Sequence, residues 1–386
     1  MRPVPRGFVL WQLGFRPFYL LASVFATASI AIWAVQYAGW LPGTYLRGPL
    51  WHAHEMLFGF TLAVLAGFLF TAVRNWTQQP TPTGLRLASL AALWLAARAL
   101  ALTPYASIAM VVDVAFPLAV AAAIAVPLAR AGNRRNYIFI ALLVAIAIAD
   151  LAFHLSLRHP SSLPADRGIR AGLDIFLLIV TVMGGRVIPM FTNNGIPGCN
   201  ATRQPATERA VLGTTFAVLA LDALAIEGPV LEFVLLACAF ANVARAVLWQ
   251  PWRTLRAPLV WILHAAYAWI PVHLVMRVLA AVDDLPAVLA THALTVGTLG
   301  AITLGMMVRT ARGHTGRPLR ADGVETASFL LIVAAALVRV FGPLVAPSAY
   351  LGTVVAAAVA WSLAFGLYAV RYATILTRPR LDGKPG

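Results

Sequence analysis

WHAHEMLFGFTLAVLAGFLFTAV, residues 51–73, is an apolar run that opens on two histidines and a glutamate. As a helix, residues 55–73 come close to the roughly 20 residues needed to cross the hydrocarbon core of a bilayer. Ionisable groups at the edge of hydrocarbon are costly to keep there, so they usually mark an ion path, a proton relay or a bound metal. The run therefore predicts a transmembrane helix with a functional site at its first turn, around His52, His54 and Glu55.

The whole chain has the composition of a membrane protein. Its 386 residues are 61% hydrophobic and 11% charged, with a mean hydropathy of +0.82, which is more apolar surface than a soluble domain of this size can bury. Apolar segments of about 20 residues follow one another with short connectors and no linker. We therefore expect an all-α, polytopic transmembrane helix bundle of about twelve spans, forming a single transmembrane domain over residues 1–386. The expected spans are 18–39, 55–73, 86–103, 106–129, 137–157, 170–190, 208–226, 230–249, 258–280, 287–308, 324–344 and 348–372.

Basic residues outnumber acidic ones, with 29 Lys and Arg against 14 Asp and Glu. In a soluble protein this excess would indicate nucleic acid, but in this chain the charges sort by side of the bilayer. If the N-terminus is cytoplasmic, twenty basic residues lie inside and four, Arg47, Arg158, Arg167 and Arg170, lie in outer loops. This bias follows the positive-inside rule. We expect both termini in the cytoplasm and no nucleic-acid partner.

Two of the expected spans share a pattern of small residues. The pattern is His54, Gly59, Ala63 and Gly67 in the second span and His292, Gly297, Ala301 and Gly305 in the tenth, with identical spacings. Small residues four apart lie on one helix face and let a neighbouring helix or a flat ligand approach the backbone closely. The pattern indicates two related hairpins, with chance or ordinary helix packing as the alternative.

The geometry of a helix limits how the polar residues can act together. Residues two apart diverge by about 200°, so His52 and His54 can share a metal only if residue 52 lies in a non-helical lead-in. Asp150 and His154 are four apart, which fits a hydrogen-bonded pair on one helix face. Acids within or beside the outer halves of spans could form a proton route or simply pair with arginines inside the bundle. These acids are Glu55, Asp113, Asp150, Asp174, Asp222 and Glu232. The candidate partners are Arg98, Arg245, Arg277 and Arg339.

The histidines favour a metal cofactor. Neutral imidazole is a suitable ligand for haem iron, copper and zinc, and two cysteines are too few for iron–sulfur sites. Many aromatic residues and no nucleotide motif favour haem or copper over zinc alone. The candidate metal ligands are His52, His54, His264 and His292, whereas His154, His159 and His273 are interpreted as packing residues. Arg186, which follows a glycine pair, and His314 could contact an anion such as a haem propionate, with lipid headgroups as the alternative.

Several longer motifs carry a family resemblance. They are GFRPFY at 14–19, WHAHEMLFG at 51–59, GRVIPMFTNN at 185–194, His264 with Tyr267 and Trp269, HALTVG at 292–297, GMM at 305–307 and GHTGR at 313–317. With them the chain resembles, nearly end to end, the NnrS family of bacterial haem- and copper-containing inner-membrane proteins linked to nitric oxide stress. One departure is RNWT at 74–77, where the family is expected to carry a proline that would end the helix sharply.

The resemblance implies a multi-pass protein of the bacterial inner membrane that binds haem b and copper, with nitric oxide as its small-molecule ligand. The implied metal ligands are His54 and His292, then His52 and His264, and the implied cofactor contacts are Tyr267, Arg186 and His314. In an enzymatic form, two nitric oxide molecules would be reduced to nitrous oxide, with protons delivered through Glu55 and electrons from an unidentified donor. Two other functions stay open: a transporter of a metal, haem or small anion, and a haem-based sensor without turnover.

Overall fold

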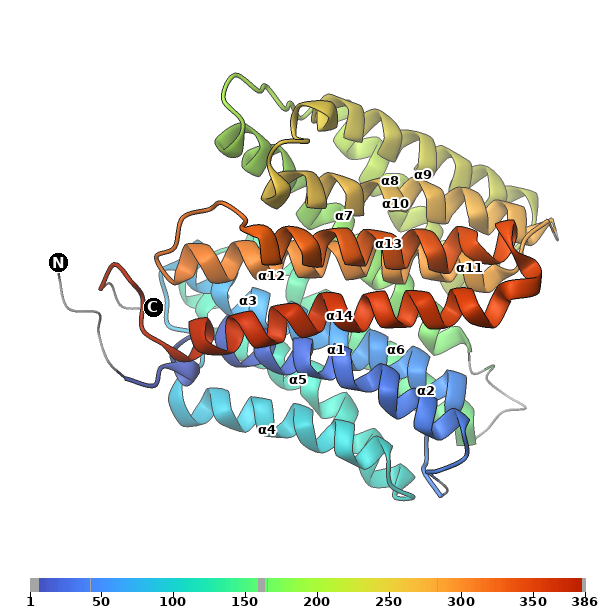
Figure 1. The fold of residues 1–386 in the computed structure, drawn as a ribbon, viewed down its shortest axis with the longest axis horizontal. Coiled ribbons are helices and arrows are strands. Elements are labelled where there is room, and N and C mark those ends of the chain that lie inside the picture. Colours follow the sequence, from blue (N-terminus) through green and yellow to red (C-terminus); the bar gives the residue numbers. More distant parts are fainter. Residues whose placement is uncertain (1–6, 42, 159–163, 165, 283, 384–386) are drawn as a thin grey trace. The chain divides into compact units, whose positions relative to one another are not determined.

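The chain folds into long helices joined by short connections (Figure 1), as seen in a computed structural model that describes residues 7–41, 43–158, 164, 166–282 and 284–383. Within those residues every regular element is helical, which confirms the all-α prediction. Eleven of the described helices are long and apolar enough to cross a membrane, so the chain is a multi-pass membrane protein. His159, interpreted above as a packing residue, lies outside the described residues.

The helix boundaries follow in chain order. The α-helices are α1 (Phe15–Tyr37), α2 (Gly48–His54), α3 (Leu62–Thr77), α4 (Gly84–Ala101), α5 (Ala106–Arg130), α6 (Ile138–Arg158), α7 (Asp166–Gly195), α8 (Pro205–Ala223), α9 (Pro229–Leu248), α10 (Pro258–Ala281), α11 (Ala287–His292), α12 (Ala301–His314), α13 (Gly323–Val345) and α14 (Tyr350–Thr377). The π-helical segments η2 (Glu55–Thr61) and η5 (Ala293–Gly300) join α2 to α3 and α11 to α12 without a break. Single 3₁₀ turns are η1 (Leu10–Gln12), η3 (Arg134–Asn136), η4 (Pro251–Arg253) and η6 (Pro347–Ala349).

Local sequence sets several helix starts. Proline occupies the first turn of α8, α9 and α10, where the missing N–H costs no hydrogen bond. At α13 the Asp322 carboxylate accepts from the Val324 and Glu325 backbone N–H groups, and the Glu325 carboxylate accepts from the Asp322 N–H. This reciprocal cap satisfies backbone donors that the helix itself leaves unpaired.

Eleven of the twelve expected spans match these membrane-crossing helices, and the remaining one, 208–226, corresponds to α8. α8 is helical over 19 residues and packs beside α9. It carries Glu208, Arg209 and Asp222, so its composition does not mark it as a span in the way that the other helices are marked.

The chain divides into two compact units. Unit 1 comprises Met1–Gly172, Arg309–Pro318 and Phe365–Gly386, and unit 2 comprises Leu173–Val308 and Leu319–Ala364. In unit 1, α1 packs along α3, and an added Cβ at Gly67 would lie 3.0 Å from Phe18 and Tyr19. The Val9 N–H also donates to the Thr377 carbonyl at 3.0 Å, so segments near both chain ends meet at one end of this unit.

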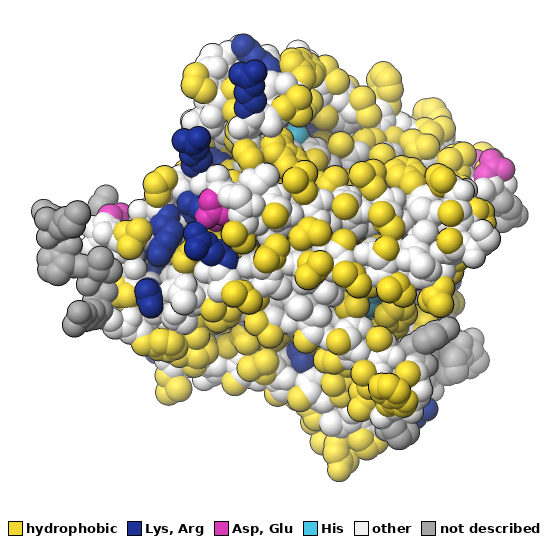
Figure 2. All heavy atoms as spheres, in the orientation of Figure 1, with side chains coloured by type: hydrophobic (Ala, Val, Ile, Leu, Met, Phe, Trp, Pro, Cys, Tyr) yellow, Lys and Arg dark blue, Asp and Glu magenta, His cyan; other side chains and the backbone are white. Residues whose placement is uncertain are grey.

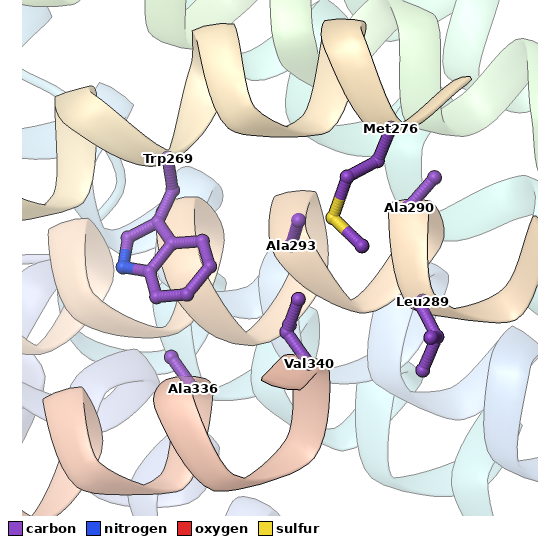
Figure 3. Packing of buried hydrophobic residues seen from close by; sticks show 7 residues of the cluster. All are labelled: Trp269, Met276, Leu289, Ala290, Ala293, Ala336 and Val340. Atoms are coloured by element: carbon purple, nitrogen blue, oxygen red, sulfur yellow. The ribbon is translucent and has the colours of Figure 1, made fainter. Parts of the chain in front are cut away.

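Unit 2 has its own hydrophobic core (Figure 3). Trp269 and Met276 of α10 pack against Leu289 and Ala290 of α11, Ala293 of η5, and Ala336 and Val340 of α13. The Trp269 ring also covers Gly297, where an added Cβ would overlap the indole. The small residue at this position therefore lets α10 approach η5 closely.

The two π-helical segments occupy equivalent positions in the sequence repeat. η2 begins directly after His54, and η5 begins directly after His292. In η2 the Thr61 hydroxyl donates to the Met56 carbonyl at 2.8 Å, and the Trp94 indole N–H donates to the Gly59 carbonyl at 3.0 Å. π segments are rare and are frequent at functional sites. Their shared position supports a relationship between the two hairpins.

The surface fits a bilayer environment. Figure 2 shows hydrophobic side chains along the helices of the face in view, with Lys and Arg gathered near helix ends. Phe233 and Phe240 of α9 and Val370 of α14 are more than two-thirds exposed, at 72%, 78% and 80%. Because a bilayer solvates such side chains, these helices contact lipid.

Candidate metal centre

Four polar side chains converge inside unit 1. They are His54 of α2, Asp113 of α5, and Asp150 and His154 of α6, hereafter the His54 group. Each residue offers one ligand atom, and these atoms all lie within 4.8 Å of one another. All four residues are at most 2% exposed. Two imidazoles and two carboxylates therefore meet in a site closed to water.

Both histidines direct Nε2 at the same two carboxylates. His54 Nε2 lies 2.9 Å from Asp150 Oδ1 and 3.4 Å from Asp113 Oδ2. His154 Nε2 lies 3.4 Å from the same Asp150 oxygen and 3.6 Å from the same Asp113 oxygen. Asp113 Oδ2, Asp150 Oδ2 and His154 Nε2 are buried without a hydrogen-bond partner among the described residues. Such atoms are costly unless a proton or a cation joins them, so the group fits a bound metal ion.

A second layer of polar groups holds the two imidazoles from behind. His54 Nδ1 lies 3.0 Å from Glu55 Oε1, and His154 Nδ1 lies 3.1 Å from the Tyr45 hydroxyl. Burial raises the pKa of the Tyr45 phenol, so the hydroxyl stays protonated at neutral pH. Metal-ligating histidines typically carry such a partner on the other ring nitrogen, which fixes the ring and its tautomer.

Arg98 of α4 links Glu55 to Asp113 of the His54 group. Its guanidinium donates to Glu55 Oε1 at 2.6 Å and, with its other branch, to Asp113. The side chain is 6% exposed. Arg98 is therefore a partner of buried acids, which was the alternative to a proton route in the interpretation of the sequence.

Aromatic side chains cover the group. The Phe153 ring stacks on His54, with ring centroids 4.9 Å apart, and Phe58 lies 5.3 Å away. Phe153 also belongs to a buried hydrophobic cluster with Leu46 and Trp51. These residues keep water from the polar groups, which strengthens every charge interaction among them.

His52 does not join His54. α2 begins at Gly48, after an extended Arg47 and with proline in its first turn, so residue 52 is helical. The condition under which His52 and His54 could share a metal, a non-helical residue 52, is therefore not met. The two side chains leave the helix in different directions, and the His52 ring packs on Trp33 with centroids 5.1 Å apart.

In unit 2, His264 and Tyr267 of α10 lie in separate hydrogen-bonded contacts. His264 Nε2 lies 2.8 Å from the Thr192 hydroxyl of α7. The Tyr267 hydroxyl accepts from Arg245 at 3.2 Å and donates to Asn242. Both aromatic side chains are buried, so each is fixed by the helices around it.

Side chains of the protein itself pack against Gly184 and Gly185, the glycine pair before Arg186. An added Cβ at Gly185 would overlap the Arg245 guanidinium, and one at Gly184 would lie 3.3 Å from the Tyr267 ring. Arg245 also makes a bidentate contact with Glu208 at 2.9 and 2.7 Å. Arg186, which follows Gly185 in the chain, is half-buried.

His292 resembles His54 in that an oxygen atom of the protein holds its Nδ1. Its Nδ1 lies 2.7 Å from the Val288 carbonyl, which can only accept, so Nδ1 carries the proton and Nε2 is the basic nitrogen. In unit 1 Glu55 holds His54 Nδ1, and the equivalent position after His292 is Ala293. A backbone carbonyl thus holds the ring in one hairpin and a carboxylate holds it in the other.

His314 lies where three sequence motifs of unit 1 meet. Its ring lies 5.6 Å from the Phe15 ring, and Nε2 lies 3.5 Å from Asn75 Nδ2. Its carbonyl accepts from Arg380 at 3.0 Å, and Arg16 donates to the Leu376 carbonyl at 2.8 Å. The C-terminal tail is therefore docked against the residues of the 14–19 and 313–317 motifs.

Sequence reasoning found His54 and Glu55 but missed three members of the group. His154 was interpreted as a packing residue, although its spacing from Asp150 predicted the contact that the structure shows. Asp113 carried no signal beyond its place in an outer half-span. The pairing of Arg277 with Asp174 and Asp222 in unit 2 shows that buried acids in this chain also form ordinary ion pairs.

The comparison with protein families agrees with the sequence motifs. A search of curated proteins returned no match to the chain. A protein-family model described as NnrS protein matches residues 9–380, which is nearly the whole chain. The protein is therefore a member of the NnrS family, with a buried histidine–aspartate group of metal-binding type inside its transmembrane helices.

Proposed function

We propose that this protein is a metal-dependent protein of the bacterial inner membrane that binds nitric oxide and removes it, with both termini in the cytoplasm. The observation that carries the proposal is the His54 group, whose four ligand atoms lie within 4.8 Å of one another in a buried site. Intramembrane ionisable groups of this kind mark function by default, because they are expensive to keep in hydrocarbon. Membership of the NnrS family supports nitric oxide as the ligand.

Haem b and copper are the proposed redox cofactors. Haem iron would supply an open coordination position for a diatomic gas. His292 would suit a ligand to haem iron, because the Val288 carbonyl fixes the tautomer in which Nε2 is basic. His264 and His52 are further metal-ligand candidates, and Tyr267, Arg186 and His314 are proposed to contact the cofactor.

Reduction is the stronger form of the proposal. Two nitric oxide molecules, two protons and two electrons give one nitrous oxide and one water. Glu55 is proposed as a proton carrier, since it lies buried between His54 and Arg98. The electrons would come from a separate donor.

The test uses protein purified in detergent from membranes. We expect an optical haem spectrum, metal by elemental analysis, and nitric oxide consumption at an electrode under a chemical reductant. His54→Ala should lower metal content and consumption, whereas His273→Gln, which alters a buried histidine held by the Ala290 carbonyl, should change neither. Wild-type protein with no cofactor and no consumption above that of empty micelles would end the proposal.

Transport is a second candidate, favoured by the paired π segments. Transporters often place their binding sites at irregular helices in corresponding positions of two repeats. η2 and η5 are such a pair, each directly after a histidine. Uptake of radioactive zinc or of haem into sealed proteoliposomes, abolished by His54→Ala, would favour this function. Haem-containing protein that consumes nitric oxide and moves neither solute would exclude it.

A further inference from the structure

We propose that the His54 group binds a single non-haem divalent cation of the first transition row, such as Zn²⁺, Fe²⁺ or Mn²⁺. The ligands are Nε2 of His54 and His154, Oδ2 of Asp113 and Oδ1 of Asp150. The inference deepens the proposed function and rests on it only in taking the protein to be metal-dependent. It separates this site from any haem in the same protein.

The spacing of the four atoms fits a small tetrahedral ion. Bonds of 2.0–2.2 Å to nitrogen and oxygen place the ligand atoms of such a site roughly 3.3 Å apart. The Nε2–oxygen distances in the group are 2.9, 3.4, 3.4 and 3.6 Å. An ion at their centre therefore needs only small adjustments of the side chains.

The charge of the group fits a divalent ion. Three buried carboxylates, those of Glu55, Asp113 and Asp150, face one guanidinium, that of Arg98. With neutral imidazoles the carboxylates exceed the guanidinium by two negative charges, and an ion of charge two cancels them. Buried charge without such compensation is strongly unfavourable.

The donor set selects among ions. Imidazole suits zinc, iron, copper and nickel, and carboxylate suits harder ions such as manganese. No sulfur atom belongs to the group, so monovalent copper, which prefers thiolate and thioether, finds no favoured ligand. Two nitrogens and two oxygens at near-tetrahedral spacing therefore favour Zn²⁺, Fe²⁺ or Mn²⁺ over Cu²⁺ and Ni²⁺, which prefer square-planar or tetragonal sites.

Haem does not fit around His54. Asp150 Oδ1 lies 2.9 Å from His54 Nε2, in the space that the iron and porphyrin of a haem bound to His54 would need. The ring is also flanked by Phe153 at 4.9 Å, by His154 at 5.0 Å and by Phe58 at 5.3 Å. A single ion can enter this space and a macrocycle cannot.

Three surrounding residues orient the ligand atoms. Glu55 and Tyr45 hold the Nδ1 atoms, which leaves each Nε2 to face the ion. Arg98 holds Asp113 through one oxygen, so the second oxygen faces the histidines. Loss of such outer partners typically lowers metal affinity by 10–100-fold.

The experiment titrates chelator-stripped protein in detergent with Zn²⁺ and with Co²⁺, the latter as an optical probe of tetrahedral geometry. We expect one ion per chain and intense visible Co²⁺ bands. Asp150→Asn should abolish both. Tyr45→Phe, which keeps all four ligands, should keep the stoichiometry and weaken affinity about 10-fold. Asp222→Asn, which alters a buried carboxylate paired with Arg277 in unit 2, is the matched control and should bind like wild type.

Haem content and nitric oxide consumption measured on the same samples separate the two proposals. Asp150→Asn protein that keeps haem but loses the ion supports the inference. Loss of haem together with the ion would mean that the group holds the haem, and would overturn the inference while leaving the proposed function. Stripped wild type that binds neither Zn²⁺ nor Co²⁺ would also overturn it. A protein that binds one ion but never contains haem or consumes nitric oxide would instead defeat the proposed function.

Discussion

Replacement of Arg98 by methionine tests the charge balance of the His54 group. The guanidinium is 6% exposed and contacts two carboxylates, with 2.6 Å between Nη1 and Glu55 Oε1 and a second contact to Asp113. Methionine keeps an unbranched apolar stem and removes the positive charge. Breaking a buried ion pair by deleting one partner costs about 3–5 kcal/mol, because it leaves the other charge buried and uncompensated. We expect Arg98→Met to lose a free energy of unfolding in that range.

Arg98→Lys separates charge from geometry. An ammonium keeps the positive charge but lacks the planar fork that lets arginine reach two carboxylates at once. Loss of one hydrogen bond to a charged group costs about 1.5–3 kcal/mol, so the lysine variant should lie between wild type and Arg98→Met.

The assay is reversible unfolding in mixed micelles with increasing SDS, followed by tryptophan fluorescence. Arg86→Met is the matched control, because Arg86 lies exposed on the same helix and surface changes usually stay within about 0.5 kcal/mol. Equal unfolding free energies for Arg98→Met and Arg86→Met would refute the ion-pair reasoning and the charge count built on it.

The remaining predictions concern glycines at close contacts. Gly185→Ala should cost about 3–5 kcal/mol in the same unfolding assay, because its Cβ displaces Arg245 from its buried partner, whereas Gly213→Ala in open space on α8 should gain up to about 1 kcal/mol. The opposite order would contradict the packing at Gly185. Gly316→Ala should speed proteolysis of the C-terminal tail, because φ is +73° and the new Cβ would lie 2.9 Å from Asp382. Gly383→Ala, with φ of +70° and no neighbour within 4 Å, should leave the cleavage rate near that of wild type.

The hairpins that contain His54 and His292 show what a sequence repeat can and cannot predict. The repeat itself was visible in the sequence, but the chemistry of each copy was not. The spacing of small residues identified both hairpins, and in the structure His54 and His292 each directly precede a π segment. The groups around them differ, since Glu55 holds one ring and the Val288 carbonyl holds the other. A repeat preserves backbone geometry more readily than the side chains that give each copy its chemistry.

The sequence by itself determined the helices and their approximate boundaries. In hydrocarbon every backbone N–H and C=O of a single spanning segment must be hydrogen-bonded within that segment, so long apolar runs fold as helices. It also predicted the Asp150–His154 contact, because that pair is set by the pitch of a single helix. His52 shows the limit of this local reasoning, since the start of α2 at Gly48 made residue 52 helical.

Only the tertiary structure decided which residues form the His54 group, the candidate metal centre. His54 and Asp150 are 96 positions apart in sequence, and their contact depends on where the fold brings the end of α2 to α6, which itself packs on α5. Asp174 and Asp222 lie beside Arg277 as ordinary ion pairs, and nothing in the spacing of Asp113 distinguishes it from Asp174. Hydropathy determines which segments lie in the bilayer. The direction of each polar side chain within the bundle depends instead on how the helices pack against one another.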